Sequence, residues 1–195
     1  MKKQSKIKPE LDIHLGVLDG VIRLLGLMSK TTAERRTLVQ IYFASGLFSQ
    51  AERNYNAQLT EQIRNLDSRI SVYLPQENTS INDKHRYADS TMIARADTAQ
   101  LLKCDLMLAL LDGICIDAGV ASEIGVAYAH KIPILGLYTD TRQQGATNSQ
   151  KLAALQQIAE NQFHYLNLYT TGLIKLNGTI VNNSADLMRQ IKNYL

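Results

Sequence analysis

Three acidic residues, Asp112, Asp117 and Glu123, follow an apolar segment at residues 105–111. Residues 118–129 are mainly Ala, Gly, Val and Ile, a composition typical of a helix that packs closely on a sheet. If residues 105–111 form a strand of a parallel sheet, the carboxylates lie at its C-terminal edge, where open α/β sheets bind ligands. Near the start of a helix, the helix dipole favours the ionised form of a carboxylate. A positioned, ionised Glu is the nucleophile that covalent glycosyl chemistry requires.

Each of these acids also has a purely structural interpretation. Glu123 would lie on an otherwise apolar helix, where a carboxylate is unfavourable unless it is paired, faces a cleft or faces solvent. Asp117 is also a suitable N-cap for that helix. A further acid, Asp97, lies in a segment with helical character and would be an ordinary exposed residue there. Local sequence alone leaves both interpretations open.

The bulk composition describes an ordinary globular chain. It is 45% hydrophobic and 20% charged, and its 195 residues suffice for a sizeable core. The net charge of +3 is small and spread along the chain, so it gives no support to a nucleic-acid partner. The one basic cluster lies in residues 2–8 and is better explained as a solvated tail.

The N-terminal region contains an apolar run at residues 11–27. Asp12, Asp19 and Arg23 interrupt it too often for a signal peptide or a membrane span. Its apolar residues recur at intervals of three and four, which predicts an amphipathic helix. We therefore expect residues 1–38 to form an N-terminal helical extension and residues 39–195 to form the main globular domain.

Several common functional motifs are absent from the sequence. Neither a Gly-x-Gly-x-x-Gly segment nor a phosphate-binding Gly-Lys-Ser/Thr loop is present, so no nucleotide cofactor is expected. No His-x-x-x-His or Cys-x-x-Cys spacing occurs, so no metal is expected either, and no Gly-x-Ser-x-Gly elbow is present. The two cysteines, Cys104 and Cys115, are interpreted as reduced core thiols of a cytoplasmic protein.

Predicted strands and helices alternate over most of the chain. Strands are expected at residues 39–44, 70–75, 105–111, 132–138 and 163–169. Helices are expected at residues 49–66, 87–103, 118–130, 150–160 and 184–195, the first with a capping box at residues 49–52. Asn177-Gly178 predicts a type I′ turn in a hairpin at residues 174–181. This alternation predicts an α/β three-layer sandwich with a mainly parallel five-stranded sheet of the flavodoxin or Rossmann kind.

In combination these features resemble the nucleoside 2-deoxyribosyltransferase family, from about Gln40 to the C-terminus. The shared segments are the strand and loop at residues 41–48, the Leu-Pro-Gln-Glu-Asn segment at residues 74–78, Asp97, and an Asp-x-Gly-x-x-x-Glu motif that ends at Glu123. Asp97 lies 26 residues before Glu123 and Asp117 lies six before it, spacings that agree with the family. Each of these features alone is weak, and only their combination is specific for the family. The resemblance does not cover residues 1–38.

The resemblance implies roles for the three acids. Glu123 matches the nucleophile that attacks C1′ of a 2′-deoxynucleoside and forms a covalent deoxyribosyl-enzyme. Asp97 matches the acid that assists departure of the base, for which it needs a raised pKa. Asp117 matches the residue that holds the sugar 5′-hydroxyl. The scheme has the two carboxyl groups of a retaining glycosidase, and its substrates are 2′-deoxynucleosides and free nucleobases.

The resemblance also implies binding residues and an assembly. Tyr42, Gly46 and Phe48 match positions that line the pocket for base and sugar, where an aromatic face stacks on the base. Gln76 lies near the family's base-contacting Gln. Asn167 matches an Asn that a neighbouring subunit adds to each site, so a homo-oligomer built of dimers is expected.

Two other functions remain open in the sequence. The same carboxylates would serve an N-glycoside hydrolase of 2′-deoxynucleosides or their 5′-monophosphates, with water as acceptor. Asp117 argues against the monophosphate because two like charges repel by about 4 kcal/mol at a separation of about 4 Å near a protein surface. Arg142 is a candidate partner for a phosphate group, so a 5′-monophosphate remains an alternative substrate. A nucleoside-binding domain without catalysis is the third interpretation, motivated by the N-terminal extension.

Overall fold

The computed structural model describes residues 38–82, 85, 87–144, 146–160 and 165–195. The expected N-terminal extension lies almost wholly outside these residues. Its helix and the domain boundary at residue 38 therefore stay predictions.

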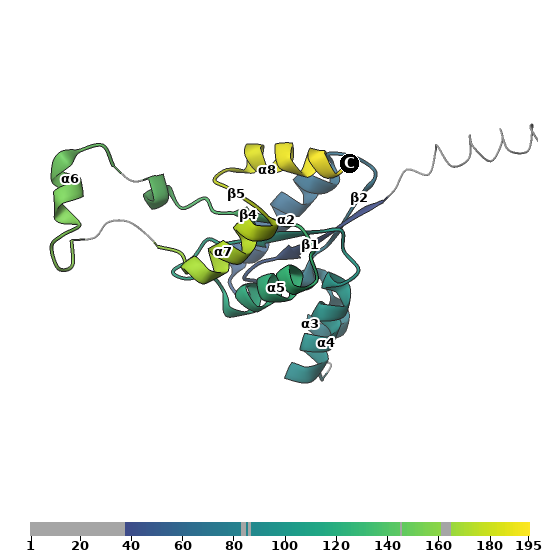
Figure 1. Cartoon of the computed structure of the whole chain (residues 1–195). Coiled ribbons are helices and arrows are strands. Elements are labelled where there is room, and N and C mark those ends of the chain that lie inside the picture. The colour runs from purple at the N-terminus through teal and green to yellow at the C-terminus, as the bar shows by residue number, and fades with distance from the viewer. Residues whose placement is uncertain (1–37, 83–84, 86, 145, 161–164) are drawn as a thin grey trace, which may run out of the picture. The chain divides into compact units, whose positions relative to one another are not determined.

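The centre of the domain is a five-stranded sheet in the order β2-β1-β3-β4-β5 (Figure 1). Every pair of neighbouring strands is parallel. The strands are β1 Val39–Ala44, β2 Ile70–Tyr73, β3 Leu106–Leu110, β4 Ile134–Leu137 and β5 Gly178–Val181. The chain leaves β1 toward β2 on one side and continues with β3 on the other, so the switch point lies at the carboxyl ends of β1 and β3. This order is the flavodoxin-like one, as predicted.

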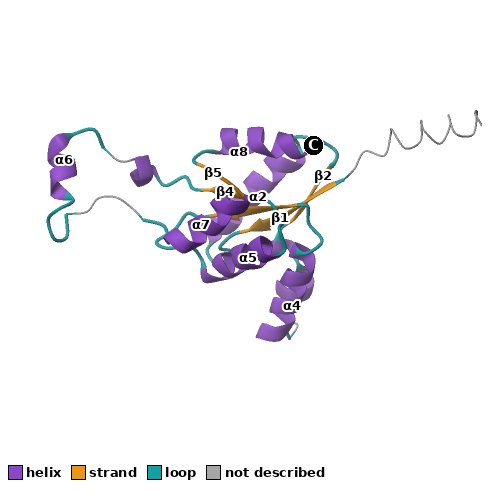
Figure 2. Ribbon diagram, in the orientation of Figure 1, coloured by secondary structure: helices purple, strands orange, loops and turns teal. Residues whose placement is uncertain are grey.

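Helices α2 (Gln50–Arg64) and α8 (Ser184–Ile191) cover one face of the sheet (Figure 2). Leu59 and Ile63 of α2 pack with Leu187 and Ile191 of α8 in one buried cluster, together with side chains of β1 to β4. The capping box expected at the start of α2 is confirmed: Ser49 Oγ accepts a hydrogen bond from Glu52 N, and Glu52 Oε2 accepts one from Ser49 N.

The opposite face is covered by α4 (Ser90–Leu101), α5 (Ala118–Ala129) and α7 (Leu168–Asn177) (Figure 2). Their buried residues form a second cluster with the other faces of β1, β3 and β4. Because β1 and β3 are covered on both faces, their side chains are almost all buried, as in the central strands of a parallel sheet. The predicted three-layer α/β sandwich is confirmed.

The connections carry short helical segments. They are the 3₁₀ turns at Pro75–Glu77, Thr141–Gln144 and Lys192–Tyr194, together with α3 (Thr79–Asn82) and α6 (Ser149–Ala154). Helix α6 is shorter than the helix expected at residues 150–160. In the part of the chain that the structure describes, no helix combines the length and the apolar character needed to cross a membrane.

The C-terminal part of the sheet differs from the prediction. The strand expected at residues 163–169 is wrong, because α7 begins at Leu168 and residues 165–167 form no strand, while residues 163 and 164 lie outside the described part. The hairpin expected at residues 174–181 is also wrong. Residues 174–177 end α7, and residues 178–181 form β5, which pairs in parallel with β4. The count of five parallel strands is right, but the fifth strand comes later in the chain.

Close packing of two strands explains why residue 178, where the sequence suggested a turn, is a glycine. Gly178 has an extended φ of 171°, not the positive φ of a type I′ turn. A Cβ at this position would lie 1.9 Å from the carbonyl oxygen of Ile134 on β4. Gly178 is therefore required because two strands approach closely, and Asn177 ends α7 by donating its side-chain amide to the carbonyl of Ile132.

The two cysteines differ from one another in environment. Both are free; Cys104 is half-buried and donates to the carbonyl of Gln100, whereas Cys115 is exposed. The expectation of a core position is therefore wrong for Cys115, which lies in the loop between β3 and α5.

Candidate active site

A cavity of about 210 Å³ lies at the carboxyl ends of β1 and β2 and beside the start of α5. Asp97, Asp117 and Glu123 all line it, so the three acids to which the family resemblance assigns roles meet at one place. Its other lining residues are Ser45, Leu47, Phe48, Pro75, Ile81, Ile93, Gly119 and Val120. The carboxylates therefore lie in a mostly apolar hollow at the expected edge of the sheet.

Glu123 is held by Tyr42, which lies 81 residues earlier in the chain. The Tyr42 hydroxyl donates to Oε1 of Glu123 at 2.6 Å. The Tyr42 side chain is fully buried in β1, so this contact fixes one carboxylate oxygen and leaves Oε2 for the cavity. This short hydrogen bond therefore fixes the position of the Glu123 carboxylate.

The protonation of Glu123 differs from the expectation based on the helix dipole. Burial, the largest effect, and the charges of Asp97 and Asp117 together raise the pKa of Glu123 from 4.5 to about 7. The hydrogen bond from Tyr42 acts in the opposite direction, because it favours the ionised carboxylate. At this second turn of α5, desolvation outweighs any stabilisation by the helix dipole.

Asp97 reaches the same cavity from α4. Its Oδ1 accepts a hydrogen bond of 3.3 Å from the hydroxyl of Tyr73, at the end of β2. Burial raises the pKa of Asp97, while this contact lowers it. The raised pKa agrees with the expectation for an acid, but its cause is burial and not the neighbouring carboxylate.

Asp117 is the N-cap of α5, which confirms its structural interpretation. Its Oδ1 accepts hydrogen bonds from the backbone N–H groups of Gly119 at 2.8 Å and Val120 at 3.1 Å. Its Oδ2 takes no hydrogen bond from the residues that the structure describes. Asp117 also lines the cavity with Glu123, so one oxygen caps the helix while the carboxylate remains part of the site.

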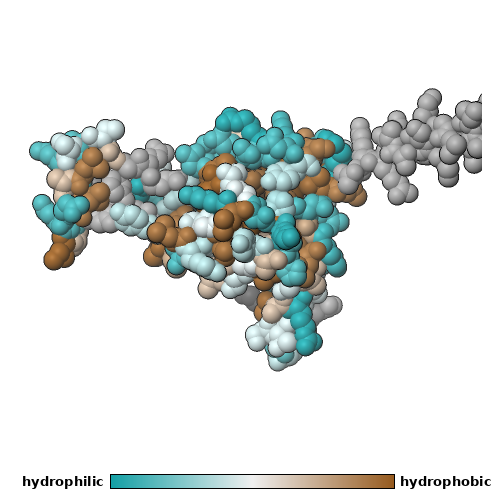
Figure 3. Space-filling view, in the orientation of Figure 1, coloured by the Kyte–Doolittle hydropathy of each residue, from teal (hydrophilic) through white to brown (hydrophobic). Residues whose placement is uncertain are grey.

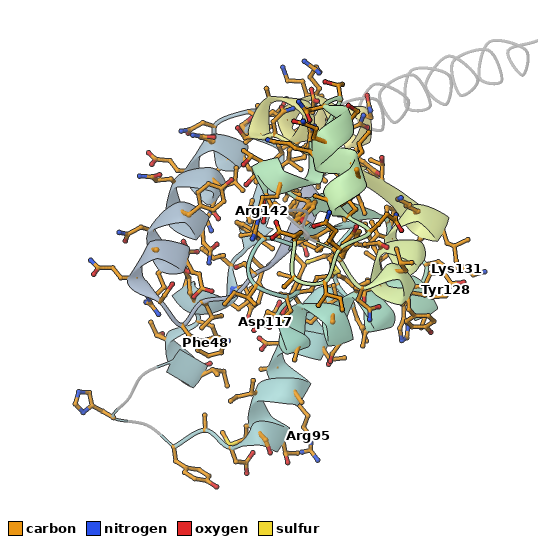
Figure 4. All side chains as sticks on the ribbon, turned by 90° about the vertical axis from the view of Figure 1, so that its left-hand side faces the viewer. Phe48, Arg95, Asp117, Tyr128, Lys131 and Arg142 are labelled. Atoms are coloured by element: carbon orange, nitrogen blue, oxygen red, sulfur yellow. The ribbon has the colours of Figure 1, made fainter. Side chains whose placement is uncertain are left out.

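Phe48 and Gly46 come from the loop after β1. The Phe48 ring is 83% exposed and lines the cavity, and Figure 4 shows it on the same side of the molecule as Asp117. Gly46 lines a neighbouring cavity of about 670 Å³, which shares Asp117 with the first. A Cβ at Gly46 would lie 2.6 Å from a carboxylate oxygen of Glu52, so a larger residue here would displace the side chain that caps α2.

Gln76 lies behind this loop and does not line the cavity. Its Oε1 accepts from Asn56 at 3.1 Å, and its Nε2 donates to the carbonyl of Arg53 at 3.0 Å. Asn56 is fully buried and also donates to the carbonyl of Gly46 at 2.9 Å. The structure thus places Gln76 in a network that supports the β1 loop, apart from the three acids.

Asn167 does not line the cavity that holds the three acids of its own chain. It is exposed at the N-terminus of α7, where its Oδ1 accepts from Thr170 N at 3.0 Å. The side-chain amide nitrogen makes no hydrogen bond to the described residues. This placement leaves the expected contribution to a neighbouring subunit's site as a prediction.

Asp112, the first acid of the opening motif, has a structural role. Its two carboxylate oxygens accept from the backbone and hydroxyl of Thr139, both at 2.6 Å, and from Asp140 N at 3.2 Å. These contacts tie the loop after β3 to the loop after β4. Arg142 in that second loop forms a salt bridge with Asp140.

Tyr73 and Asn78 also belong to the site, although no role for either was predicted from the sequence. Tyr73 pairs in register with Tyr42 on the neighbouring strand, and the two rings stack with centroids 5.4 Å apart. Asn78 donates to the Tyr73 hydroxyl at 3.0 Å. A tyrosine at the fourth position of each of the two predicted strands, residues 39–44 and 70–75, was the available signal for this pair.

A third cavity, of about 360 Å³, lies between α4 and α5 and shares Asp97 and Glu123 with the first. The acids thus stand where two hollows meet. Among the residues described, no group of three or more His, Cys, Asp and Glu side chains is placed to hold a metal ion.

Comparison with solved structures supports the fold. A conserved protein from Enterococcus faecalis V583 is 66% identical, with a TM-score of 0.78, over 82% of this chain and 100% of that chain. The 2-deoxyribosyltransferase of Bacillus psychrosaccharolyticus is 17% identical, with a TM-score of 0.53, over 77% of this chain and 90% of that chain. The enzyme of that name from Leishmania mexicana is 18% identical, with a TM-score of 0.56, over 80% of this chain and 99% of that chain. The last two show a shared fold.

Comparison by sequence identifies the family. No functionally curated protein matches the chain. The sequence profile of the nucleoside 2-deoxyribosyltransferases matches residues 41–169, which begin in β1 and end in α7 and include all three acids of the cavity. The chain therefore belongs to the nucleoside 2-deoxyribosyltransferase family.

Proposed function

We propose that the protein transfers the 2-deoxyribosyl group between nucleobases through a covalent intermediate on Glu123. In the first step an oxygen of the Glu123 carboxylate attacks C1′ of a 2′-deoxynucleoside. The bond between C1′ and the base nitrogen breaks, its electron pair goes to the base, and the base takes a proton from Asp97. The products are a glutamyl-deoxyribose ester, a neutral free base and the Asp97 carboxylate.

The second step runs in reverse with a different base. A nitrogen of the incoming base attacks C1′, the ester bond breaks, and Glu123 leaves as a carboxylate. Asp97 takes the proton that the incoming base loses. Two inversions at C1′ retain the β configuration, as in a retaining glycosidase.

The observation that carries this proposal is the pairing of Glu123 and Asp97 in one cavity, each with one oxygen held by a tyrosine. The reaction needs one proton on the pair, on Asp97. The short contact from Tyr42 favours a charged Glu123, whereas the contact to Asp97 is longer by 0.7 Å. The Tyr42 contact thus acts against burial, which raises the pKa of Glu123 and on its own would keep the proton on that residue.

The carboxylate of Asp117 supports free nucleosides as substrates over 5′-monophosphates. Its uncapped oxygen is available to accept a hydrogen bond from a 5′-hydroxyl, while its charge repels a phosphate. Arg142, the candidate phosphate partner, is paired with Asp140. No observation thus favours the monophosphate hydrolase.

The direct test is incubation of the protein with thymidine and adenine, followed by chromatography. We expect deoxyadenosine and thymine in equal amounts, with no added cofactor. Free deoxyribose that persists with excess adenine would instead support the hydrolase. Saturable nucleoside binding without exchange or hydrolysis would support the binding domain.

We also propose a cytoplasmic homo-oligomer in which Asn167 completes the site of a neighbouring subunit. The exposed position of Asn167 supports this, because its amide nitrogen is available beside exposed apolar side chains of α7. Water competes with the incoming base for the intermediate, and a site closed by a partner would exclude it. The two free thiols are compatible with a reducing compartment.

A further inference from the structure

A chain of hydrogen bonds leads from a backbone N–H group to Asp97. Ser80 N donates to Oδ1 of Asn78 at 3.1 Å. Because a backbone N–H can only donate, this contact fixes the orientation of the Asn78 amide. The Asn78 nitrogen therefore points to the Tyr73 hydroxyl and donates to it at 3.0 Å.

The direction of these hydrogen bonds determines where the hydroxyl proton of Tyr73 points. An amide nitrogen has no acceptor capacity, so the Tyr73 hydroxyl proton must go elsewhere. It goes to Oδ1 of Asp97, 3.3 Å away. Oδ1 of Asp97 is consequently an acceptor, and a proton on this carboxyl group belongs on Oδ2.

The Tyr73 ring is held in place by its neighbour. It stacks on Tyr42 at an interplanar angle of 27°, and the two residues are register partners on adjacent parallel strands. Tyr42 in turn holds Glu123. The stacked pair thus sets the direction of both carboxyl groups that line the cavity.

We propose that Tyr73, oriented by Asn78, is a positioning residue that places the proton of Asp97 on Oδ2, toward the departing base. This inference rests on the proposed function, and it adds the residue that determines which oxygen of Asp97 carries the proton. Tyr73 itself touches no reacting atom, and it acts only through Asp97.

Tyr73→Phe should lower kcat for exchange by about 10- to 100-fold with little change in KM. This is below the 10²- to 10⁴-fold typical of a complete general acid, because the acid itself remains. The effect should shrink for a 2′-deoxyriboside of a nitroazole, whose anion leaves without protonation. It should also be non-additive with Asp97→Asn, since both changes remove one function.

Asn78→Asp tests the orientation of the Tyr73 hydroxyl more directly. The added carboxylate oxygen accepts the Tyr73 proton and turns it away from Asp97, so we expect a loss similar to that of Tyr73→Phe. Tyr128→Phe, on the exposed side of α5 at the end remote from Asp117 (Figure 4), is the matched control and should exchange bases at the normal rate.

A titration of Asp97 separates this inference from the proposed function. The Tyr73 hydrogen bond lowers the pKa of Asp97, so Tyr73→Phe should raise it, as measured by carbon-13 NMR of the carboxyl groups. An unmoved Asp97 pKa overturns the inference whether or not the wild type exchanges bases. Normal kcat in Tyr73→Phe overturns it while leaving base transfer intact. A wild type without exchange refutes the proposed function alone, and the titration still decides the role of Tyr73.

Discussion

At the scale of single residues, the chemistry depends on two carboxyl groups whose pKa values are raised by burial. Glu123 and Asp97 share one cavity, and each is held by a different tyrosine. Desolvation disfavours the charged forms, whereas both tyrosine contacts favour them. The pair therefore retains a proton near neutral pH more readily than two exposed acids would.

Replacement of the proposed nucleophile should separate activity from stability. Glu123→Gln keeps an oxygen that accepts from Tyr42 but removes the nucleophile, so base exchange should fall by at least about 10³-fold. The pKa of Glu123 is raised on folding, so this residue's contribution to stability is present below pH 4.5 and is lost as the pH rises toward 7. Above pH 8 the variant should be more stable than the wild type, by up to about 3 kcal/mol.

Urea unfolding at pH 5 and pH 8 checks this prediction. Glu61→Gln, an exposed position of α2, is the control and should change neither activity nor stability. Near-normal exchange by Glu123→Gln would contradict the proposed role of Glu123.

Removal of the Tyr42 hydroxyl should shift the pH dependence of the reaction. The hydrogen bond from Tyr42 lowers the pKa of Glu123, so Tyr42→Phe should raise it above about 7. Because Glu123 must be ionised to attack, the rising limb of kcat/KM against pH should move up by about one pH unit. An unshifted rising limb in Tyr42→Phe would show that Glu123 does not control it.

At the scale of elements, the C-terminal part of the sheet depends on close approach of backbones. Helix α7, which buries Thr170, Thr171 and Ile174, packs on α5, and β5 follows it without an intervening loop. Gly178, the first residue of β5, lies against the first residue of β4.

A side chain at Gly178 should destabilise the domain. The Cβ in Gly178→Ala would overlap the carbonyl of Ile134, so β5 must shift, and we expect a loss of about 3 kcal/mol or more. Gly172→Ala is the matched control, because its Cβ would meet no atom within 4 Å on α7. The control should gain about 0.5–1 kcal/mol through helix propensity. Thermal unfolding of the two variants is the measurement, and equal melting temperatures would refute the packing argument.

At the scale of the whole molecule, the proposed assembly depends on the outer side of α7. This helix exposes Leu168, Tyr169 and Leu176, and Figure 3 shows brown, hydrophobic side chains gathered over it. Asn167 directly precedes this surface. An apolar surface beside an available amide fits a contact that brings Asn167 into another copy's site.

Mixed oligomers test whether the sites are shared. Asn167→Asp keeps the cap of α7, since aspartate also accepts from Thr170, but it loses the amide donor. We expect Asn167→Asp and Glu123→Gln each to be nearly inactive and mixtures of the two, after exchange of subunits, to regain activity. Each hybrid dimer would contain one site with both native groups. Mixtures that remain as inactive as their parents would refute shared sites.

A matched surface variant separates assembly from folding. Leu168→Asp should weaken the oligomer by burying a charge at the contact, whereas Leu152→Asp on α6 should not. Sedimentation velocity of both variants measures the effect. A wild type that sediments as a monomer at micromolar concentration would contradict the proposed assembly.

The sequence by itself determined the sheet through β4 and the three acids of the site. Apolar β-branched runs, the Ser49 capping box and the small-residue stretch of α5 are local signals, and each predicted its element correctly. The position of Asp117 and Glu123 after β3 placed them at the carboxyl edge of the sheet, and the family resemblance added Asp97.

Only the tertiary structure decided α7, β5 and the environment of the acids. Residues 168–177 contain Tyr, Thr and Ile, which favour strands, yet packing on α5 and the Asn167 cap make them helical. The Tyr42–Glu123 and Tyr73–Asp97 contacts join residues 81 and 24 positions apart. The raised pKa of Glu123 follows from burial that the folded chain alone creates. Local sequence specifies backbone preferences, but desolvation and hydrogen-bond partners arise only when distant segments exclude water together.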